Sequence, residues 1–195
     1  PVRALSVASL GEAMTAVSRD REILSRSILC MDARGDETVR LIDERYGADR
    51  LFRKNGNILG LAYGLPKLAW VREHRRDLFD RAYKFLLWED LVFYLLGCDP
   101  VTDYSLANRT LLFDIRAKAW AQDILDLAGI PIEKLPGVAP SGTSLGPISD
   151  RVADDLGLPR GTIAVTGGHD QCANALGAGI VAPGSAAYGI GSFIC

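Results

Sequence analysis

The sequence predicts an α/β fold, because strand-like segments near both ends enclose a long helical stretch. Residues 3–10 (RALSVASL) read as a buried strand at the beginning of the chain. Residues 161–168 (GTIAVTGG) predict a second buried strand, and a helix is expected to start directly after it at Asp170. Between these strands, from about residue 65 to 128, apolar residues recur at helical spacing.

The first fifty residues predict a strand, a turn, a second strand and then a helix. The segment 14–24 (MTAVSRDREIL) contains the polar group SRDRE, which is typical of a hairpin turn. A helix is expected over about 37–46, with Ile42 on its apolar face. Gly47 is its predicted end, because glycine readily adopts the left-handed conformation that closes a helix.

Three helices and one turn are expected in the middle of the chain. Leu68 and Val71 line one short amphipathic helix, and residues 89–97 (EDLVFYLLG) predict a second. A third helix is expected to end at Gly129. The segment 102–114 (TDYSLANRTLLFD) reads as a polar turn cluster that runs into a short apolar piece.

The last third returns to alternating helix and strand after a Pro/Gly/Ser-rich connection at 135–149. Ser149 is the predicted N-cap of a helix that ends at Gly157. Residues 172–195 carry no charge, but glycines interrupt their apolar groups, so we expect no membrane span. The stretch is instead expected to be buried on both faces, with a strand pair and a glycine turn at 185–195.

The composition excludes several classes of function. The 195 residues are enough for one large domain, and the formal net charge is only −2. A nucleic-acid-binding domain would normally carry a basic stripe, so no nucleic-acid partner is expected. The four cysteines lack CxxC spacing and the two histidines lie far apart, so no metal site is predicted. Such scattered cysteines indicate reduced thiols and a cytoplasmic location.

Both ends of the chain look like cuts within a longer sequence. The chain has no initiator Met and no signal peptide, and a strand begins almost at once. At the other end, the chain stops inside a strand-like run. A free strand edge of this kind favours aggregation, so we expect a partner strand elsewhere in the complete protein.

Asp170 is the first candidate functional residue. It follows a buried strand and two glycines, which places it at the carboxyl end of a strand, where α/β sheets usually bind ligands. Gly167 and Gly168 would allow a substrate to approach the backbone closely. On spacing alone the favoured role of Asp170 is the N-cap of the following helix, a common role for aspartate, and the two roles are compatible.

Two further patterns each have two interpretations. Residues 189–192 (GIGS) form a glycine turn, which is either an anion-binding nest or a tight hairpin turn. Residues 142–146 (GTSLG) match the nucleophile-elbow motif G-x-S-x-G, which would make Ser144 the nucleophile of a serine hydrolase. The motif requires a strand before it and a helix after it, and the flanking sequence predicts neither, so a plain loop is the favoured interpretation.

Taken together, five segments resemble the FGGY family of carbohydrate kinases. Residues 6–13 (SVASLGEA) resemble its early substrate strand, and residues 31–34 (MDAR) resemble its W-x-D-x-R element. Residues 67–70 (KLAW) and 102–114 resemble its middle landmarks. Residues 157–179, which include TGGHDQ, resemble its signature of a strand, Gly-Gly-x-Asp and a helix. The order and spacing of the five segments are those of the family.

The resemblance implies a ribonuclease H-like, actin-like ATPase domain that works with ATP and Mg²⁺. Residues 1–182 would form the N-terminal sugar-binding domain without its first strands, with a mostly helical insertion at about 50–130. Residues 183–195 would begin the C-terminal nucleotide-binding domain. The family's metal-binding aspartate would precede residue 1, so no metal ligand is assigned here, and this stretch alone is expected to be inactive.

The resemblance also assigns roles to individual residues. Asp170 falls on the family's catalytic base and Gln171 on the neighbour that contacts substrate hydroxyls. Glu12 falls on the hydroxyl-binding glutamate of glycerol kinase, and Tyr63 lies near a substrate-side aromatic. The residues that fall on the second phosphate motif, and would bind the nucleotide, are Gly189, Gly191 and Ser192.

These residues suit a small-molecule sugar or polyol as substrate. Glu12 and Gln171 pair with hydroxyl groups, and no cluster of Arg and Lys is expected around them, which argues against an anionic sugar acid. A homodimer is one expectation for the oligomeric state. The competing hypothesis is a non-catalytic sugar-sensing or actin-like module of the same fold.

Overall fold

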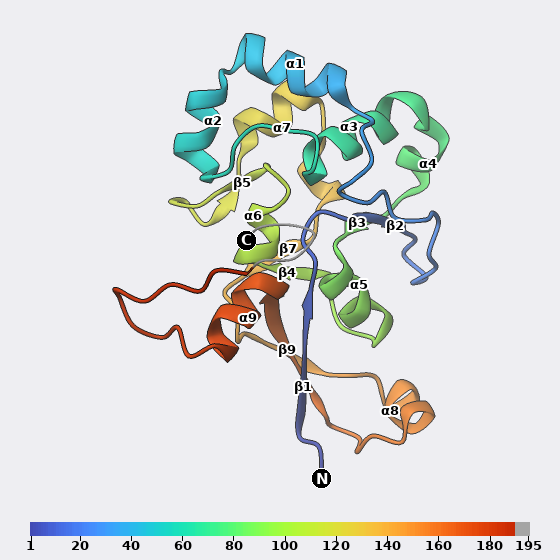
Figure 1. Ribbon diagram of the computed structural model, residues 1–195. Helices are drawn as coiled ribbons and strands as arrows, with labels where there is room; N and C mark the ends of the chain where they lie inside the picture. The colour runs from blue at the N-terminus through green and yellow to red at the C-terminus, as the bar shows by residue number, and fades with distance from the viewer. Residues whose placement is uncertain (190–195) are drawn as a thin grey trace.

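A computed structural model describes residues 1–189 and shows a helical end stacked on a sheet end (Figure 1). Helices α1, α2, α3, α4 and α7 gather at one end, β1, β8 and β9 lie at the other, and α5 and α6 lie between them. The helices are α1 (Asp36–Arg45), α2 (Ala48–Asn55), α3 (Gly64–His74), α4 (Arg76–Arg81), α5 (Trp88–Leu95), α6 (Tyr104–Asn108), α7 (Gln122–Ala128), α8 (Asp150–Leu156) and α9 (Asp170–Gly177), with a 3-10 helix at Ile132–Lys134.

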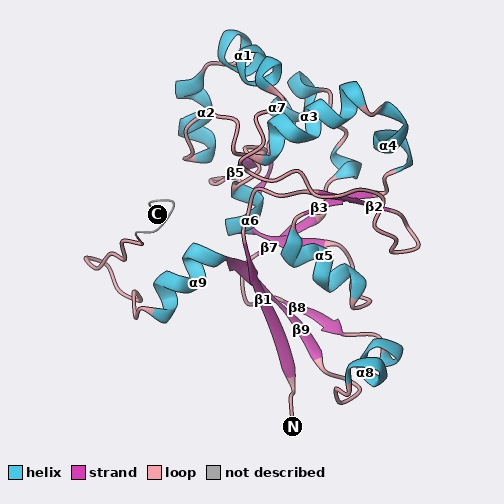
Figure 2. Ribbon diagram, turned by 45° about the vertical axis from the view of Figure 1, so that its right-hand side comes forward, coloured by secondary structure: helices cyan, strands magenta, loops and turns pink. Residues whose placement is uncertain are grey.

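The largest sheet has three strands in the order β1-β9-β8 (Figure 2). Strand β1 (Ala4–Ser9) runs parallel to β9 (Ile163–His169), and β8 (Ser144–Pro147) runs antiparallel to β9. Because β1 and β9 are parallel, their carboxyl ends meet at the same edge of the sheet. This edge therefore brings the residues after Ser9 next to Asp170.

Three pairs of short strands connect the helical end to the sheet. Strand β2 (Thr15–Val17) pairs with β3 (Lys84–Leu86) in the antiparallel direction. Strand β5 (Phe113–Asp114) pairs with β6 (Ala119–Trp120), also antiparallel. Strand β4 (Val101–Asp103) runs parallel to β7 (Gly137–Ala139). The polar turn predicted after β2 is confirmed, since Ser18 N donates to Glu22 O at 3.0 Å. The predicted return strand is wrong, because the segment after the turn makes only isolated bridges and β3 takes its place beside β2.

The described residues form three apolar clusters, and the two larger ones are the cores of the helical end and of the sheet end. The larger lies at the helical end, where Ile42, Leu68 and Ile124 from three different helices are buried. The smaller lies under the sheet, where Phe93 of α5 packs with Ala164 of β9. Burying a side chain as large as Leu, Ile or Phe contributes about 1.5–3 kcal/mol, so each core fixes the elements that surround it.

Several predicted helix boundaries are confirmed. Helix α1 ends where expected, with Gly47 following its C-cap residue, Tyr46. The Ser149 hydroxyl accepts a hydrogen bond from Val152 N at the start of α8, and Gly157 ends that helix in the left-handed conformation with φ 68°. These caps satisfy backbone groups that a helix end would otherwise leave without partners.

The segment 102–114 was predicted as a turn, and this is wrong. It contributes to strand β4 and then forms α6, whose N-cap is Asp103. The Asp103 carboxylate accepts from Ser105 N at 2.7 Å and from Leu106 N at 3.3 Å. The polar residues that suggested a turn in fact cap a helix, because the same hydrogen bonds from side chain to backbone stabilise turns and helix N-termini.

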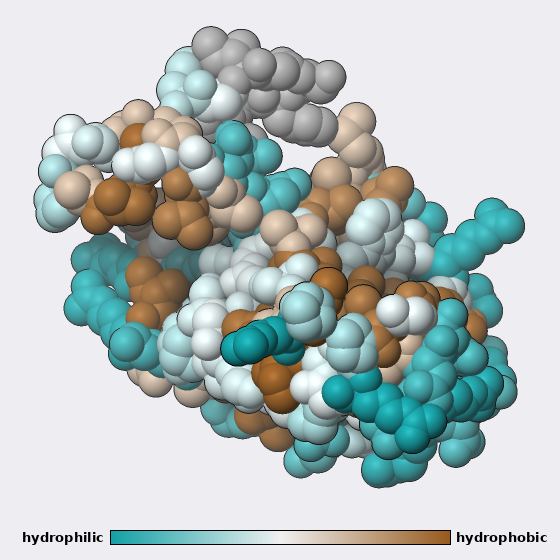
Figure 3. Space-filling view, turned by 90° about the horizontal axis from the view of Figure 1, so that it is seen from below, coloured by the Kyte–Doolittle hydropathy of each residue, from teal (hydrophilic) through white to brown (hydrophobic). Residues whose placement is uncertain are grey.

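The expectation that the uncharged residues after Cys172 are buried is also wrong. Helix α9 has no buried residue, Leu176 is 65% exposed and Val181 is 76% exposed. Figure 3 views the molecule from below and shows hydrophobic side chains open to solvent on that face. Residues 181–189 contain neither helix nor strand, and the rest of the predicted strand pair, 190–195, lies outside the described residues.

No helix among the described residues combines the length and the apolar character needed to cross a bilayer.

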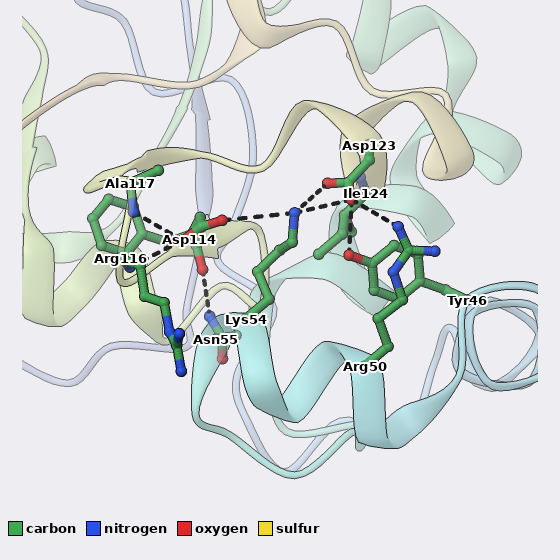
Figure 4. A network of polar contacts seen from close by, with 10 residues as sticks. Tyr46, Arg50, Lys54, Asn55, Asp114, Arg116, Ala117, Asp123 and Ile124 are labelled. Carbon is green, nitrogen blue, oxygen red and sulfur yellow. Dashed lines mark hydrogen bonds and ion pairs between the residues drawn. The ribbon is translucent and has the colours of Figure 1, made fainter.

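A network of charged groups joins α2 to α7 and to β5 (Figure 4). Lys54 Nζ donates to both carboxylate oxygens of Asp123 at 2.9 Å and lies 3.6 Å from Asp114 Oδ2. Tyr46 donates its hydroxyl proton to Asp123 Oδ2 at 2.8 Å. Burial opposes the charge on Asp123, but the hydrogen bonds from Lys54 and Tyr46 outweigh it and lower the pKa of Asp123.

Replacing Lys54 with methionine is expected to lower the free energy of unfolding by about 1 kcal/mol, because Asp123 loses its main donor while keeping partial access to water. Urea unfolding at pH 7 measures the change. The difference between Lys54→Met and wild type should shrink in acid, since stability gained from a lowered carboxyl pKa is lost as pH falls through the folded pKa. Arg40→Met, which removes a solvent-exposed pair with Asp36, is the control and should leave the midpoint unchanged.

Candidate functional site

The candidate site lies where β1 and β9 end. Gly11 follows β1 closely, and a Cβ atom at this position would lie 2.5 Å from Arg109 Cγ and 2.8 Å from His169 Cδ2. Both distances are too short for any side chain, so only glycine fits there. Segments that follow β1, α6 and β9 therefore meet at this point.

Glu12 and Arg109 form an ion pair at this junction, in which two guanidinium nitrogens contact one carboxylate oxygen. Arg109 donates from Nε to Glu12 Oε1 at 2.6 Å, and its Nη2 lies 2.5 Å from the same oxygen. Gly11 N donates to Glu12 Oε2 at 3.2 Å. Glu12 is buried, with 8% of the residue exposed. A buried carboxylate with three charge-assisted or backbone donors is held in one orientation.

Arg109 also connects Glu12 to Tyr63. Its Nη1 donates to Asn57 Oδ1 at 3.0 Å, and its guanidinium carbon lies 4.8 Å from the centre of the Tyr63 ring. A guanidinium at this distance from an aromatic ring makes a favourable cation–π contact. One arginine therefore fixes two of the residues expected to bind substrate.

Lys67 positions the chain around Tyr63 from the other side. It is buried in α3, and its Nζ donates to Leu61 O at 2.6 Å and to Asp32 O at 2.8 Å. Burial lowers the pKa of this amine. The two carbonyl partners belong to the segments around Tyr63 and MDAR, so Lys67 joins two of the sequence landmarks.

A cleft of about 780 Å³ opens beside these residues. Four of its lining residues belong to the junction or to the start of α9, and they are Tyr63, Arg109, His169 and Gln171. Asn108 and Lys118 add polar groups to the same cleft. Asp170 lies in the sequence between two lining residues, His169 and Gln171. Glu12 is hydrogen-bonded to the lining residue Arg109.

Asp170 is the first residue of α9, but it is not the N-cap. The cap is His169, whose Nδ1 accepts a hydrogen bond from Gln171 N at 3.3 Å. The capping role expected for Asp170 is therefore wrong. Its side chain is 46% exposed, and His169 Nδ1, which accepts from Gln171 N, lies 3.5 Å from Asp170 Oδ1. An aspartate in the first turn of a helix is favourably placed as an anion, and this one is open to a ligand.

The two glycines before His169 serve the protein's own packing. A Cβ atom at Gly167 would lie 2.0 Å from Val7 O of β1, and one at Gly168 would lie 3.1 Å from Ser105 Oγ. The space beside these glycines, which the sequence predicted to be open to a substrate, is occupied by the backbone of β1 and the start of α6. Glycine is needed here because the neighbouring strand passes too close for a side chain.

Arg109 is the residue that the sequence interpretation missed. No cluster of Arg and Lys was expected around Glu12 and Gln171, yet Arg109 pairs with Glu12, and Lys118 lines the cleft. The signal available in the sequence was the position of Arg109 inside the landmark TDYSLANRTLLFD. Its partner is 97 residues away in the sequence, so the pairing itself could not be predicted.

The predicted nucleotide-binding residues are described only in part. Gly189 lies in a segment without helix or strand, and Gly191 and Ser192 lie outside the described residues. Among residues 1–189, no group of three or more His, Cys, Asp or Glu side chains is placed to hold a metal ion.

Ser144 does not form a nucleophile elbow. It begins strand β8 instead of ending a strand, and the next helix starts only at Asp150. The elbow requires a serine on a sharp turn between a strand and a helix. The serine hydrolase alternative therefore has no structural support.

Comparisons with known proteins agree on one family. The model of the N-terminal domain of the FGGY family of carbohydrate kinases matches residues 1–177. The xylulose kinase of Bacillus subtilis (strain 168) is 33% identical over 179 residues, which cover 92% of this chain and 36% of that protein. The autoinducer-2 kinase of Escherichia coli (strain K12) is 32% identical over 166 residues, covering 84% of this chain and 31% of that protein.

A solved structure also matches this chain in fold. The crystal structure of the xylulose kinase from Rhodospirillum rubrum superposes with a TM-score of 0.86 at 24% identity, over 93% of this chain and 37% of that chain. This likeness confirms the predicted ribonuclease H-like, actin-like fold. The chain spans about a third of the length of the relatives it matches.

Proposed function

The chain belongs to the FGGY family of carbohydrate kinases, and we propose on this basis that the full-length protein transfers a phosphoryl group from ATP to a hydroxyl group of a sugar or polyol. The observation that carries the proposal is the junction at the ends of β1 and β9. Tyr63, Arg109 and Gln171 line one cleft there, Arg109 holds Glu12, and the half-exposed Asp170 lies in the sequence between two lining residues.

Asp170 is the proposed catalytic base. It would accept the proton of the substrate hydroxyl while the hydroxyl oxygen bonds to the γ-phosphorus, and the bond from that phosphorus to ADP breaks. An ionised aspartate is a weak base, but phosphoryl transfer depends mostly on positioning and charge stabilisation, so a late proton transfer is sufficient.

The remaining residues are proposed to orient the substrate. Gln171 and Glu12 offer amide and carboxylate groups to hydroxyls, and Tyr63 offers a flat face held by Arg109. Because Arg109 neutralises Glu12, this part of the cleft presents donors and acceptors without a net negative charge. Such a surface suits an uncharged polyhydroxylated molecule, and the relatives named xylulose kinase make a short keto sugar the first candidate.

The nucleotide and metal sites are proposed to lie mostly elsewhere in the full-length protein. Family membership implies ATP as the phosphoryl donor. Mg²⁺ is proposed to accompany ATP, and no residue of this chain is assigned to it, because residues 1–189 hold no cluster of three or more His, Cys, Asp or Glu side chains placed to hold a metal ion. Gly189, Gly191 and Ser192 stay proposed phosphate contacts. A cytoplasmic location and a homodimer are also proposed.

The test is a substrate panel with the full-length protein and MgATP, in which ADP release is measured. D-xylulose, other pentuloses, hexuloses and glycerol sample the uncharged candidates, and gluconate samples a sugar acid. We expect one uncharged sugar to raise ADP release about 100-fold or more over the sugar-free rate, as general-base and positioning effects commonly allow. Sugar binding by calorimetry without any sugar-dependent ADP release would instead support the non-catalytic module.

A further inference from the structure

Two buried carboxyl groups lie directly behind the strand that ends at Asp170. Glu89 belongs to α5 and Asp103 to the end of β4, and both residues are 0% exposed. Glu89 Oε1 accepts a hydrogen bond from Gly167 N at 2.7 Å. The carboxyl of Glu89 is therefore bound to the backbone of β9 three residues before Asp170.

Asp103 reaches the same strand through Ser105. Its Oδ1 accepts from Ser105 N at 2.7 Å, from Ser105 Oγ at 2.6 Å and from Ser141 Oγ at 3.1 Å. Ser105 Oγ in turn accepts from His169 N at 2.8 Å. The two carboxyl groups thus fix two backbone amides of the segment that leads into Asp170.

The second oxygen of Glu89 has no donor of its own. Oε2 is buried, and within residues 1–189 no N–H or O–H group reaches it. The neighbouring Asp103 carboxyl raises the pKa of Glu89 through its charge and through a side-chain hydrogen bond, and a hydrogen bond between two carboxyl groups requires a proton on one of them. Asp103 already accepts four hydrogen bonds, including one from Leu106 N to Oδ2, so the proton belongs on Glu89.

Burial is the main reason why Glu89 keeps this proton. It raises the pKa of Glu89 to about 8, against the lowering effect of the hydrogen bond from Gly167 N and with smaller raising effects from the charge and the hydrogen bond of Asp103. Near neutral pH the side chain is therefore mostly uncharged, and it donates to Asp103 while accepting from Gly167 N.

We propose that Glu89 is a positioning residue of the phosphoryl-transfer site, whose protonated carboxyl bridges Asp103 and the Gly167 amide and so holds the strand end that carries Asp170. This inference rests on the proposed kinase function. When Glu89 loses its proton, two buried carboxylates repel each other, and the bridge breaks. The strand end then loses one of its two fixed amides, and Asp170 loses its alignment.

The other charged groups near Glu89 do not replace the bridge. On α5 itself, Asp90 is fully buried, and burial raises its pKa well above the usual range. The titratable residue on β9 is His169, whose backbone N–H donates to Ser105 Oγ. The titratable residue on β3 is Lys84, whose amine donates to Leu135 O. Strand β1 carries no titratable side chain. Among the described residues no cation pairs with Glu89, so a second negative charge there would be uncompensated.

The test compares Glu89→Gln with wild type across pH. Glutamine keeps the shape of protonated glutamate, because its carbonyl accepts from Gly167 N and its amide donates to Asp103, but it does not titrate. In the full-length protein, wild-type kcat is expected to fall about 10-fold between pH 7 and pH 9 as Glu89 ionises. In Glu89→Gln this fall should be absent. Glu73→Gln, an exposed glutamate on α3, should keep the wild-type fall.

A second measurement is independent of catalysis. Amide hydrogen exchange of residues 163–170 is compared between wild type and Glu89→Gln at the same pH, so that intrinsic exchange rates cancel. We expect similar protection at pH 7 and weaker protection in wild type at pH 9. If wild type is less protected than Glu89→Gln at pH 9 but the protein has no sugar kinase activity, the proposed bridge is supported and the proposed function is wrong. If kinase activity is present and Glu89→Gln shows the same alkaline fall, or if wild-type exchange does not change, the inference is overturned.

Discussion

Asp170→Asn in the full-length protein is expected to lower kcat by about 10²–10⁴-fold, the range over which general bases contribute. Asparagine keeps the shape of aspartate but cannot take the proton of the substrate hydroxyl. Affinity for the sugar should change little, because Glu12, Tyr63 and Gln171 are proposed to make the binding contacts. ADP release gives kcat, and calorimetry gives the sugar affinity.

The structure provides reasons why this substitution should leave the fold intact. His169 caps α9, so the helix keeps its cap when Asp170 changes, and the Asp170 side chain is 46% exposed. Asp150→Asn is a matched control, because Asp150 is also the first residue of a helix that a neighbouring side chain caps. The control should turn over at the wild-type rate. Near-normal turnover of Asp170→Asn would remove Asp170 from the mechanism.

The second large effect is expected from Gly167→Ala, which should lower the free energy of unfolding by about 3 kcal/mol, as overpacking in a tight site does. The added methyl group would lie 2.0 Å from Val7 O, and the backbone of β1 cannot move aside as a flexible side chain could. Separating β1 from β9 would also disturb the hydrogen bond from Gly167 N to Glu89. Chemical denaturation of the full-length protein, followed by circular dichroism, measures the loss.

Gly177→Ala is the control for this substitution. Gly177 ends α9, and an added Cβ would meet no atom within 4 Å. Alanine favours a helix over glycine by roughly 0.5–1 kcal/mol, so this variant should be neutral or slightly more stable. Equal denaturation midpoints for Gly167→Ala and wild type would mean that β1 and β9 do not pair as described.

Features with a strong local signal were predictable from the sequence. The run GTIAVTGG has the apolar, β-branched composition of a strand, and the helix after it begins at Asp170 as expected. The Ser149 cap and the end at Gly157 follow from the chemistry of those residues alone. The catalytic and substrate roles came from the family resemblance, and they stay predictions until the variants are measured.

Features that depend on distant partners were not predictable. Strands β4, β7 and β8 have three or four residues each, too few for an alternating pattern, and the glycines and proline of β7 and β8 read as a connection. The pairing of Arg109 with Glu12 depends on how two distant segments fold together. The absence of charge after Cys172 did not predict burial, since Leu176 and Val181 in this segment are exposed.

The pairing of β1 with β9 has a consequence for the order of events during synthesis. Ala4 and Ile163 are neighbours in the sheet although they are roughly 160 positions apart in the chain, a long loop to close. The core of the helical end is formed by residues between Met14 and Leu135, so it can fold before β9 has left the ribosome, while β1 waits for its partner. The junction of Glu12 and Asp170 is therefore among the last parts to form, and a nascent chain released before β9 would hold a folded helical core without a site.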